Sequence, residues 1–246
     1  MADKRQNRGA DPRDEDFFGP GSEEVLRAAM DDYCWLLSRG YAQSSSLKIV
    51  GDHFSLHGRQ RLAIMRGGCS IQQALARKKK RFTLEQCRGR AIAIDGYNTL
   101  ITIEAALAGA FIFSGRDGCY RDLAGLHGTY RIVAQTEPAA KLIGNYLCEY
   151  GAGPVTWYID RPISNSGRLK VLLANISDQN GWGWNFVVEN NPDKALMVTN
   201  EIVASSDSGI LDACGNWVNL ARLIVSSYVP DARVIDMGFF SSTEPR

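Results

Sequence analysis

The sequence predicts an α/β fold, a three-layer αβα sandwich with a central parallel sheet, preceded by a small, basic and mostly helical domain. After Arg90, short runs of β-branched and aromatic residues alternate with helical patterns, which is typical of a parallel sheet covered by helices. Before that point the apolar residues follow helical spacing. Charge divides the chain in the same place: residues 1–90 carry 17 Lys and Arg against 11 Asp and Glu, and the remainder carries 11 against 16.

Length and composition favour a folded protein with more than one part. The chain has 246 residues, of which 45% are hydrophobic, and this is enough to form a sizeable core. No apolar run approaches the roughly 20 residues of a membrane helix, and the charged N-terminus lacks the apolar stretch of a signal peptide. We therefore expect a cytoplasmic protein with no membrane contact. Six cysteines without a CxxC pair are expected to be reduced and mostly buried.

The N-terminal part is expected to hold a tail and a helical domain. Residues 1–21 are polar and end in Gly-Pro-Gly, which predicts a disordered tail. The domain of residues 22–88 should begin with a helix near Glu23, because apolar residues recur at helical spacing as far as Leu37. Residues 47–50 are expected to be extended and to lead into a turn at Gly51-Asp52. Two helices separated by Gly67-Gly68 complete the domain.

The second domain, residues 89–246, repeats strand and helix in close order. Helices are expected directly after the first strand and over residues 139–150, 166–176 and 209–225. The predicted strands cover residues 92–94, 155–159, 184–188, 201–205 and 233–238.

Acidic residues follow the predicted strands. Asp95 and Asp160 end two of them, Asp207 follows a third, and Asp193 lies shortly before the third. Because the carboxyl ends of parallel strands meet at one edge, these carboxylates should share a pocket. Any single aspartate is more simply explained as a helix cap, but the set favours a metal site. Grouped carboxylates repel one another unless a cation neutralises them, and oxygen ligands favour Mg²⁺ or Mn²⁺.

Three segments resemble the motifs of NYN domains, relatives of the PIN nucleases. They are IAIDGYNTLIT, VTWYIDRPIS and EIVASSDSGILD. The resemblance implies a PIN-like fold in which metal-binding acids activate a water molecule and asparagine orients the site. The catalytic residues that it implies are Asp95, Asn98, Asp160, Asp193 and Asp207, and the metal ligands are Asp95, Asp160, Asp207 and Asp212, the last as a ligand or cap.

The whole chain also resembles a family of prokaryotic, often archaeal, proteins catalogued as domain of unknown function 434. The segment GDHFSLHGRQRLAIMRGGCS carries this resemblance. It implies no activity. Because many PIN domains dimerise, the PIN resemblance leaves a homodimer open.

Basic residues indicate a nucleic-acid partner, with RNA favoured over DNA. Between Arg39 and Arg90, 12 Lys and Arg face two acidic residues. Arg59, Arg61 and Arg66 share a helix that also has an apolar face, and the segment 115–131 is an insert relative to many NYN domains. A solvated helix end or loop is the simpler alternative for these charges. The candidate nucleic-acid contacts are Arg59, Arg61, Arg77, Lys78, Lys79, Lys80, Arg116, Arg121 and Arg131.

The leading functional hypothesis is a metal-dependent endoribonuclease or RNA-processing factor. A second hypothesis is a catalytically silent RNA-binding module, in which the basic N-terminal part binds the nucleic acid. The third is a metal-dependent phosphatase for small phosphoesters, although the DxDx[TV] motif of haloacid-dehalogenase phosphatases is absent because Gly-Tyr-Asn follows Asp95.

Overall fold

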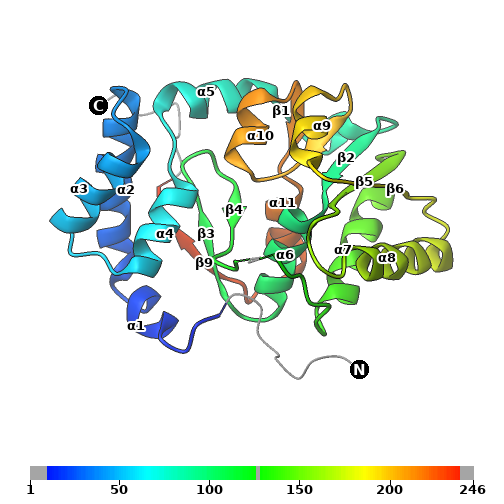
Figure 1. The fold of residues 1–246 in the computed structure, drawn as a ribbon, viewed down its shortest axis with the longest axis horizontal. Coiled ribbons are helices and arrows are strands. Elements are labelled where there is room, and N and C mark those ends of the chain that lie inside the picture. The colour runs from blue at the N-terminus through cyan, green and yellow to red at the C-terminus, as the bar shows by residue number, and fades with distance from the viewer. Residues whose placement is uncertain (1–9, 126–127, 239–246) are drawn as a thin grey trace.

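A six-stranded, all-parallel sheet organises the part of the protein that lies on the right in Figure 1. The computed structural model describes residues 10–125 and 128–238. The strand order β1-β8-β7-β2-β5-β6 puts the first strand after Arg90 in the middle of the sheet. The strands are β1 (Arg81–Phe82), β2 (Ile92–Asp95), β5 (Val155–Asp160), β6 (Asn185–Glu189), β7 (Ile202–Ala204) and β8 (Asn216–Val218).

Helices cover both faces of this sheet, which gives the three-layer αβα arrangement predicted from the sequence. One layer packs its apolar side chains on Ile92 and Ile94, and the other packs on Ala93. Strand β2 is therefore buried on both faces, which explains why its residues are uniformly apolar before Asp95. The first layer contains α6 (Gly96–Leu107), α7 (Thr136–Glu149), α8 (Ser166–Asn180) and α11 (Leu220–Tyr228), and the second contains α9 (Pro192–Val198) and α10 (Ser208–Ala213).

The N-terminal helices form a second region beside the sheet (Figure 1). Their core also includes residues from a three-stranded sheet of order β4-β3-β9, among them Phe111, Phe113 and Ile235. This core therefore joins the beginning of the chain to its end. The helices are α1 (Asp14–Phe18), α2 (Ser22–Ser38), α3 (Gln43–His53), α4 (Gly58–Gly67) and α5 (Ile71–Lys80), the strands are β3 (Phe111–Ser114), β4 (Tyr120–Arg121) and β9 (Arg233–Asp236), and a 3-10 turn, η1, covers Glu85–Cys87.

Two predictions for the N-terminal part were wrong. Residues 47–50 are not extended, because they lie within α3, which packs on α2 and α4. Within the expected disordered tail, residues 14–18 form α1, and Phe18 is buried against Phe111 and Phe113. Residues 1–9 of that tail lie outside the described residues. In both segments tertiary packing overrides a local tendency.

Two predictions for the second domain also need correction. The expected helix 209–225 is α10, β8 and α11, because residues 216–218 pair with both β1 and β7. The predicted last strand exists as β9, but it pairs with β3 in the smaller sheet. The acid at its end, Asp236, therefore lies away from the main sheet. Where described, the insert 115–131 contains β4, which pairs with β3.

Among the described residues, no helix combines the length and the apolar character needed to cross a membrane. Five of the six cysteines are buried and Cys148 is exposed, and all six are free thiols.

Candidate active site

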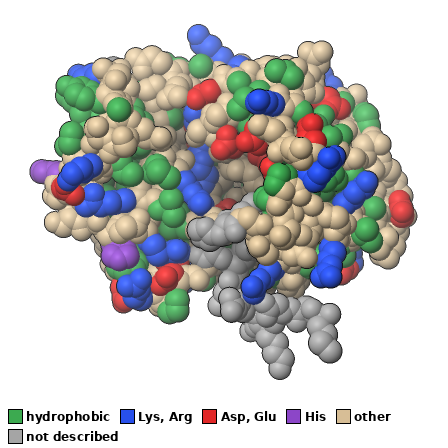
Figure 2. Space-filling view, in the orientation of Figure 1, with side chains coloured by type: hydrophobic (Ala, Val, Ile, Leu, Met, Phe, Trp, Pro, Cys, Tyr) green, Lys and Arg blue, Asp and Glu red, His purple; other side chains and the backbone are tan. Residues whose placement is uncertain are grey.

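A cleft of about 470 Å³ opens at the carboxyl edge of the main sheet. Gln43 of α3 and Met65 and Arg66 of α4 also line it, so both regions of the chain contribute to it. In Figure 2, acidic side chains gather on one side of a central hollow and basic ones on the other. The remaining lining residues are Asp95, Tyr97, Asn98, Ile101, Thr102, Arg121, Asp122, Ala124, Asp160, Asp193, Ser206, Asp207 and Ser208.

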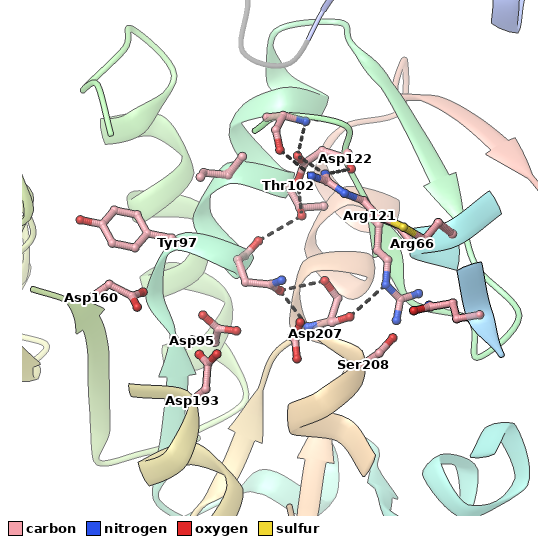
Figure 3. Close-up of a pocket in the computed structure, with 16 residues that line it drawn as sticks. Arg66, Asp95, Tyr97, Thr102, Arg121, Asp122, Asp160, Asp193, Asp207 and Ser208 are labelled. Atoms are coloured by element: carbon pink, nitrogen blue, oxygen red, sulfur yellow. Dashed lines mark hydrogen bonds and ion pairs between the residues drawn. The ribbon is translucent and has the colours of Figure 1, made fainter. Parts of the chain in front are cut away.

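Four aspartates from four different elements form the acidic wall of this cleft (Figure 3). Asp95 ends β2, and Asp160 ends the neighbouring strand β5. Asp193 lies in the first turn of α9, and Asp207 is the N-cap of α10 after β7. The convergence follows from the parallel sheet, because the carboxyl ends of its strands point to one edge.

Several oxygens of these carboxylates are left without a hydrogen-bond partner in the described part of the chain. Asp95 accepts one hydrogen bond at Oδ2, from Ser205 Oγ at 2.7 Å. Asp207 accepts at Oδ1 from the backbone N–H groups of Gly209 (2.8 Å) and Ile210 (3.0 Å), so it does cap α10. None of the four forms an ion pair with a described Lys, Arg or His. Oxygens therefore remain for a ligand.

Burial and mutual repulsion disfavour the ionised forms of three of these groups. The pKa of Asp95 is raised to about 7, mainly by burial and also by the charges of Asp193, Asp207 and Asp160, while the hydrogen bond from the Ser205 hydroxyl opposes the rise. Burial also raises the pKa of Asp160 and of Asp193, each with a contribution from another aspartate of the wall. A bound cation would reverse these effects because it favours ionised carboxylates.

As the side chains stand, no three His, Cys, Asp or Glu residues of the described chain are grouped closely enough to hold a metal ion. The donor set itself consists of carboxylate oxygens, with no thiol or imidazole among the lining residues. This chemistry suits a hard cation such as Mg²⁺ or Mn²⁺. The carboxylates would have to move closer together around the ion.

Asn98 links α6 to the loop that carries Asp207. Its Oδ1 accepts hydrogen bonds from the N–H and the hydroxyl of Ser206, both at 2.8 Å. Arg121 Nε donates to the carbonyl oxygen of Ser206 at 2.9 Å, which fixes the same loop from the other side. The amide oxygen of Asn98 is therefore engaged. Its Nδ2 amino group remains available to donate hydrogen bonds to a ligand.

Two family models match the chain, and one of them covers the segment that carries the acidic wall. The model described as Domain of unknown function (DUF5616) matches residues 84–223, which carry all four aspartates of the cleft. The chain belongs to this family. A second model, Protein of unknown function (DUF434), matches residues 25–80. The resemblance to domain of unknown function 434 therefore applies to the N-terminal segment, and DUF5616 covers residues 84–223.

A relative from Methanocaldococcus jannaschii, named as an uncharacterized protein, is 32% identical over 187 residues. The match covers 76% of this chain and 88% of the relative. No solved structure matches the chain. Neither family description mentions a PIN or NYN domain, so that relationship stays a proposal.

Asp212, expected to be a metal ligand or cap, does not line the cleft. Its carboxylate accepts hydrogen bonds from Arg77 Nε and Gln73 Nε2, both at 2.7 Å. The expected nucleic-acid contact of Arg77 is wrong for this structure, because its side chain is 1% exposed between Asp117 and Asp212. These two residues instead join α5 to α10 of the DUF5616 segment.

Other basic residues of the expected nucleic-acid surface take part in intramolecular contacts. Arg59 pairs with Asp14 on α1, and Arg61 with Asp52. Lys80 Nζ donates to three carbonyl oxygens, those of Leu211, Asp212 and Cys214. Arg116 pairs with Asp31 of α2, while Lys78, Lys79 and Arg131 are exposed.

Arg121 is buried and lies at the cleft. Its two Nη atoms donate to the carboxylate oxygens of Asp117 at 2.8 and 2.7 Å. No sequence pattern pairs Arg121 with Asp117 or singles out Ser205, Thr102 and Asp122 beside the site. Spacing alone cannot identify them, because their importance depends on contacts between distant segments.

Proposed function

We propose that this protein is a divalent-metal-dependent nuclease that hydrolyses phosphodiester bonds, with RNA as the favoured substrate. One observation carries the proposal: four aspartates with no cationic partner among the described residues line one wall of a cleft whose other lining residues include Arg66 and Arg121. Acidic and basic walls together suit a metal ion and a phosphate bound side by side.

The acidic wall supplies the ligands in this proposal. Asp95, Asp160, Asp193 and Asp207 would hold the ion, since each lines the cleft. A bound Mg²⁺ or Mn²⁺ lowers the pKa of a coordinated water and stabilises the charge that develops on a phosphodiester during attack. The resemblance to NYN domains implies three of these ligands, Asp95, Asp160 and Asp207, and it implies Asp193 as a catalytic acid.

Two other residues have positioning roles. Ser205 Oγ donates to Asp95 Oδ2 at 2.7 Å, and this hydrogen bond would keep the carboxylate in position to hold an ion. Asn98 keeps the loop of Ser206 and Asp207 in place and offers Nδ2 to a water molecule or to phosphate. Both roles require that the side chains keep a fixed orientation. The hydrogen bonds of Ser205 with Asp95 and of Asn98 with Ser206 provide it.

The test is cleavage of labelled single-stranded RNA, transfer RNA and single-stranded DNA with Mg²⁺ or Mn²⁺. Wild type is compared with the Asp95→Asn/Asp207→Asn double variant, and EDTA serves as the metal-free control. Asparagine still accepts hydrogen bonds, so Ser205 and the N-cap of α10 keep their partners. We expect metal-dependent cutting by wild type and a loss of at least about 100-fold in the variant.

The absence of a preformed metal-binding group among the described residues favours one alternative, a catalytically silent nucleic-acid-binding module. Salt-sensitive RNA binding without cutting in either metal would support that alternative. Turnover of a small phosphoester such as p-nitrophenyl phosphate, with RNA left intact, would instead identify a phosphatase. Either result contradicts the nuclease proposal.

A further inference from the structure

Arg66 brings a positive charge from the N-terminal helices into the cleft. It lies in the last turn of α4, within the segment matched by DUF434, whereas the acidic wall belongs to the DUF5616 segment. In Figure 3, Arg66 and Arg121 lie on the side of the pocket opposite Asp95, Asp160 and Asp193. A ligand in the cleft would therefore contact both segments.

The guanidinium of Arg66 is held in place, but some of its N–H donors remain available to a ligand. Its Nη1 donates to the carbonyl oxygen of Asp122 at 2.6 Å, and its Nη2 to that of Ala124 at 3.0 Å. These contacts take two of the five N–H donors that an arginine carries. The side chain is 31% exposed, so other donors can reach an anion in the cleft.

The charge of Arg66 is only partly compensated. The Asp122 carboxylate lies 3.7 Å from Nη1, and it already accepts hydrogen bonds from Thr102 Oγ1 and from the Ala124 N–H, both at 2.8 Å. Burial raises the pKa of Asp122, and the hydrogen bond from Thr102 and the charge of Arg66 oppose the rise. Arg121 differs, since both of its Nη atoms bind Asp117. Arg66 is thus the better phosphate ligand of the two.

A close backbone contact fixes α4 at this position. The N–H of Arg116 donates to the carbonyl oxygen of Gly67 at 2.8 Å. A Cβ atom built on Gly115 would lie 2.7 Å from the Gly67 oxygen and 3.0 Å from its Cα, so only glycine allows this approach. The residue that precedes Gly67 is Arg66, and the contact holds it at the cleft.

We propose that Arg66 binds a phosphate of the nucleic-acid strand whose scissile phosphodiester lies against the acidic wall. The N-terminal helices then form one side of the active site, and both family segments are needed to hold the substrate. This inference rests on the proposed function in taking nucleic acid as the ligand.

The test measures binding separately from cleavage. Full-length Asp95→Asn protein in EDTA is titrated with a fluorescein-labelled single-stranded RNA at several salt concentrations, with and without Arg66→Gln. We expect Arg66→Gln to weaken binding several-fold and to reduce the salt slope by about 0.7 to 1, the value for one phosphate contact. The matched control is Arg27→Gln, which removes an exposed arginine of α2 that pairs with Glu23 and Asp236 outside the cleft.

An Arg66→Gln protein with the slope and affinity of its parent overturns the inference. If this variant fails to fold, as judged by its thermal unfolding, Arg66→Lys replaces it. Lysine keeps the charge but loses the planar fork, so the salt slope should persist while affinity falls, and an unchanged affinity overturns the inference.

The two proposals can fail independently. A wild type that cuts RNA while Arg66→Gln keeps the same KM contradicts the role of Arg66 and leaves the nuclease function intact. A wild type that never cuts, but whose RNA binding depends on Arg66, contradicts the nuclease function and supports the phosphate contact.

Discussion

Arg77 of α5 and Asp117 of the β3–β4 turn form a buried ion pair, with Nη1 and Oδ2 at 2.6 Å and both side chains 1% exposed. Asp117 also binds Arg121, which donates to Ser206 at the candidate active site. Burial alone would raise the pKa of Asp117, but the two guanidinium groups hold it well below its usual value. The network connects the N-terminal helices to the loop of Asp207.

Asp117→Asn should destabilise the protein by about 3–5 kcal/mol, because two buried guanidinium groups would lose the charge that they share. Urea unfolding at neutral pH measures the change. Asp52→Asn is the control, since Asp52 is exposed and its pairs with Lys48 and Arg61 are surface ion pairs, which contribute little to stability. Equal, small effects of the two substitutions would show that the buried network contributes little.

Neither residues 22–88 nor residues 89–246 should fold cooperatively when expressed separately. The first fragment would lose core partners such as Phe113 and Ile235, and the second would lose edge strand β1 and the Trp217 Nε1 bond to the Arg77 carbonyl. Circular dichroism during heating, with the full chain as the control, measures this. A cooperative transition in the isolated 22–88 fragment would contradict the prediction.

Asp95→Asn should make the metal-free protein more stable at pH 8. The folded-state pKa of about 7 lies above the ordinary value of about 3.9 for aspartate. Between these values the folded protein holds a proton that the unfolded chain has released, so stability falls as pH rises from about 4 to about 7. Removal of the ionisable group abolishes that loss, which is at most about 4 kcal/mol.

Thermal unfolding in EDTA from pH 5 to pH 8 checks this, with wild type beside the variant. The variant should show the weaker dependence on pH. Parallel curves for the two proteins would contradict the raised pKa. Added Mn²⁺ should raise the Tm of wild type more than that of the variant, because the ion binds only the folded form.

Gly115→Ala should cost about 1–3 kcal/mol, since the new Cβ would overlap the Gly67 backbone. Gly58→Ala at the start of α4 is the matched control, because nothing lies within 4 Å of a Cβ there. Urea midpoints of the two variants provide the comparison. A Gly115→Ala protein as stable as Gly58→Ala would contradict this prediction. It would mean that the backbones of Gly115 and Gly67 can move apart without loss of stability.

Several features of the fold followed from local patterns. Four predicted strands, 92–94, 155–159, 184–188 and 201–205, correspond to β2, β5, β6 and β7 of the parallel sheet. The prediction of β2 and β7 succeeded because these inner strands are apolar and buried on both faces, whereas β6 lies at the edge of the sheet. The carboxyl ends of these strands lie at one edge of the sheet. The acids that follow the strands therefore come together there, and this does not depend on the exact bounds of the helices.

Other elements depended on partners distant in the sequence. Residues 47–50 have a β-branched pattern but are helical, since α3 packs on two other helices. Residues 216–218 match a helical pattern yet form β8, because β1 and β7 lie on either side of them. A local window contains neither set of neighbours.

The sequence by itself determined the parallel α/β architecture and the acids at its strand ends. Strands that alternate with helices form a parallel sheet, and the carboxyl ends of all its strands lie at the same edge. Only the tertiary structure decided which cations face those acids. Arg77 begins a run of five basic residues yet is buried in an ion-pair network, whereas Arg66 reaches the cleft. Burial and pairing arise when distant segments pack, and charge along the chain does not specify them.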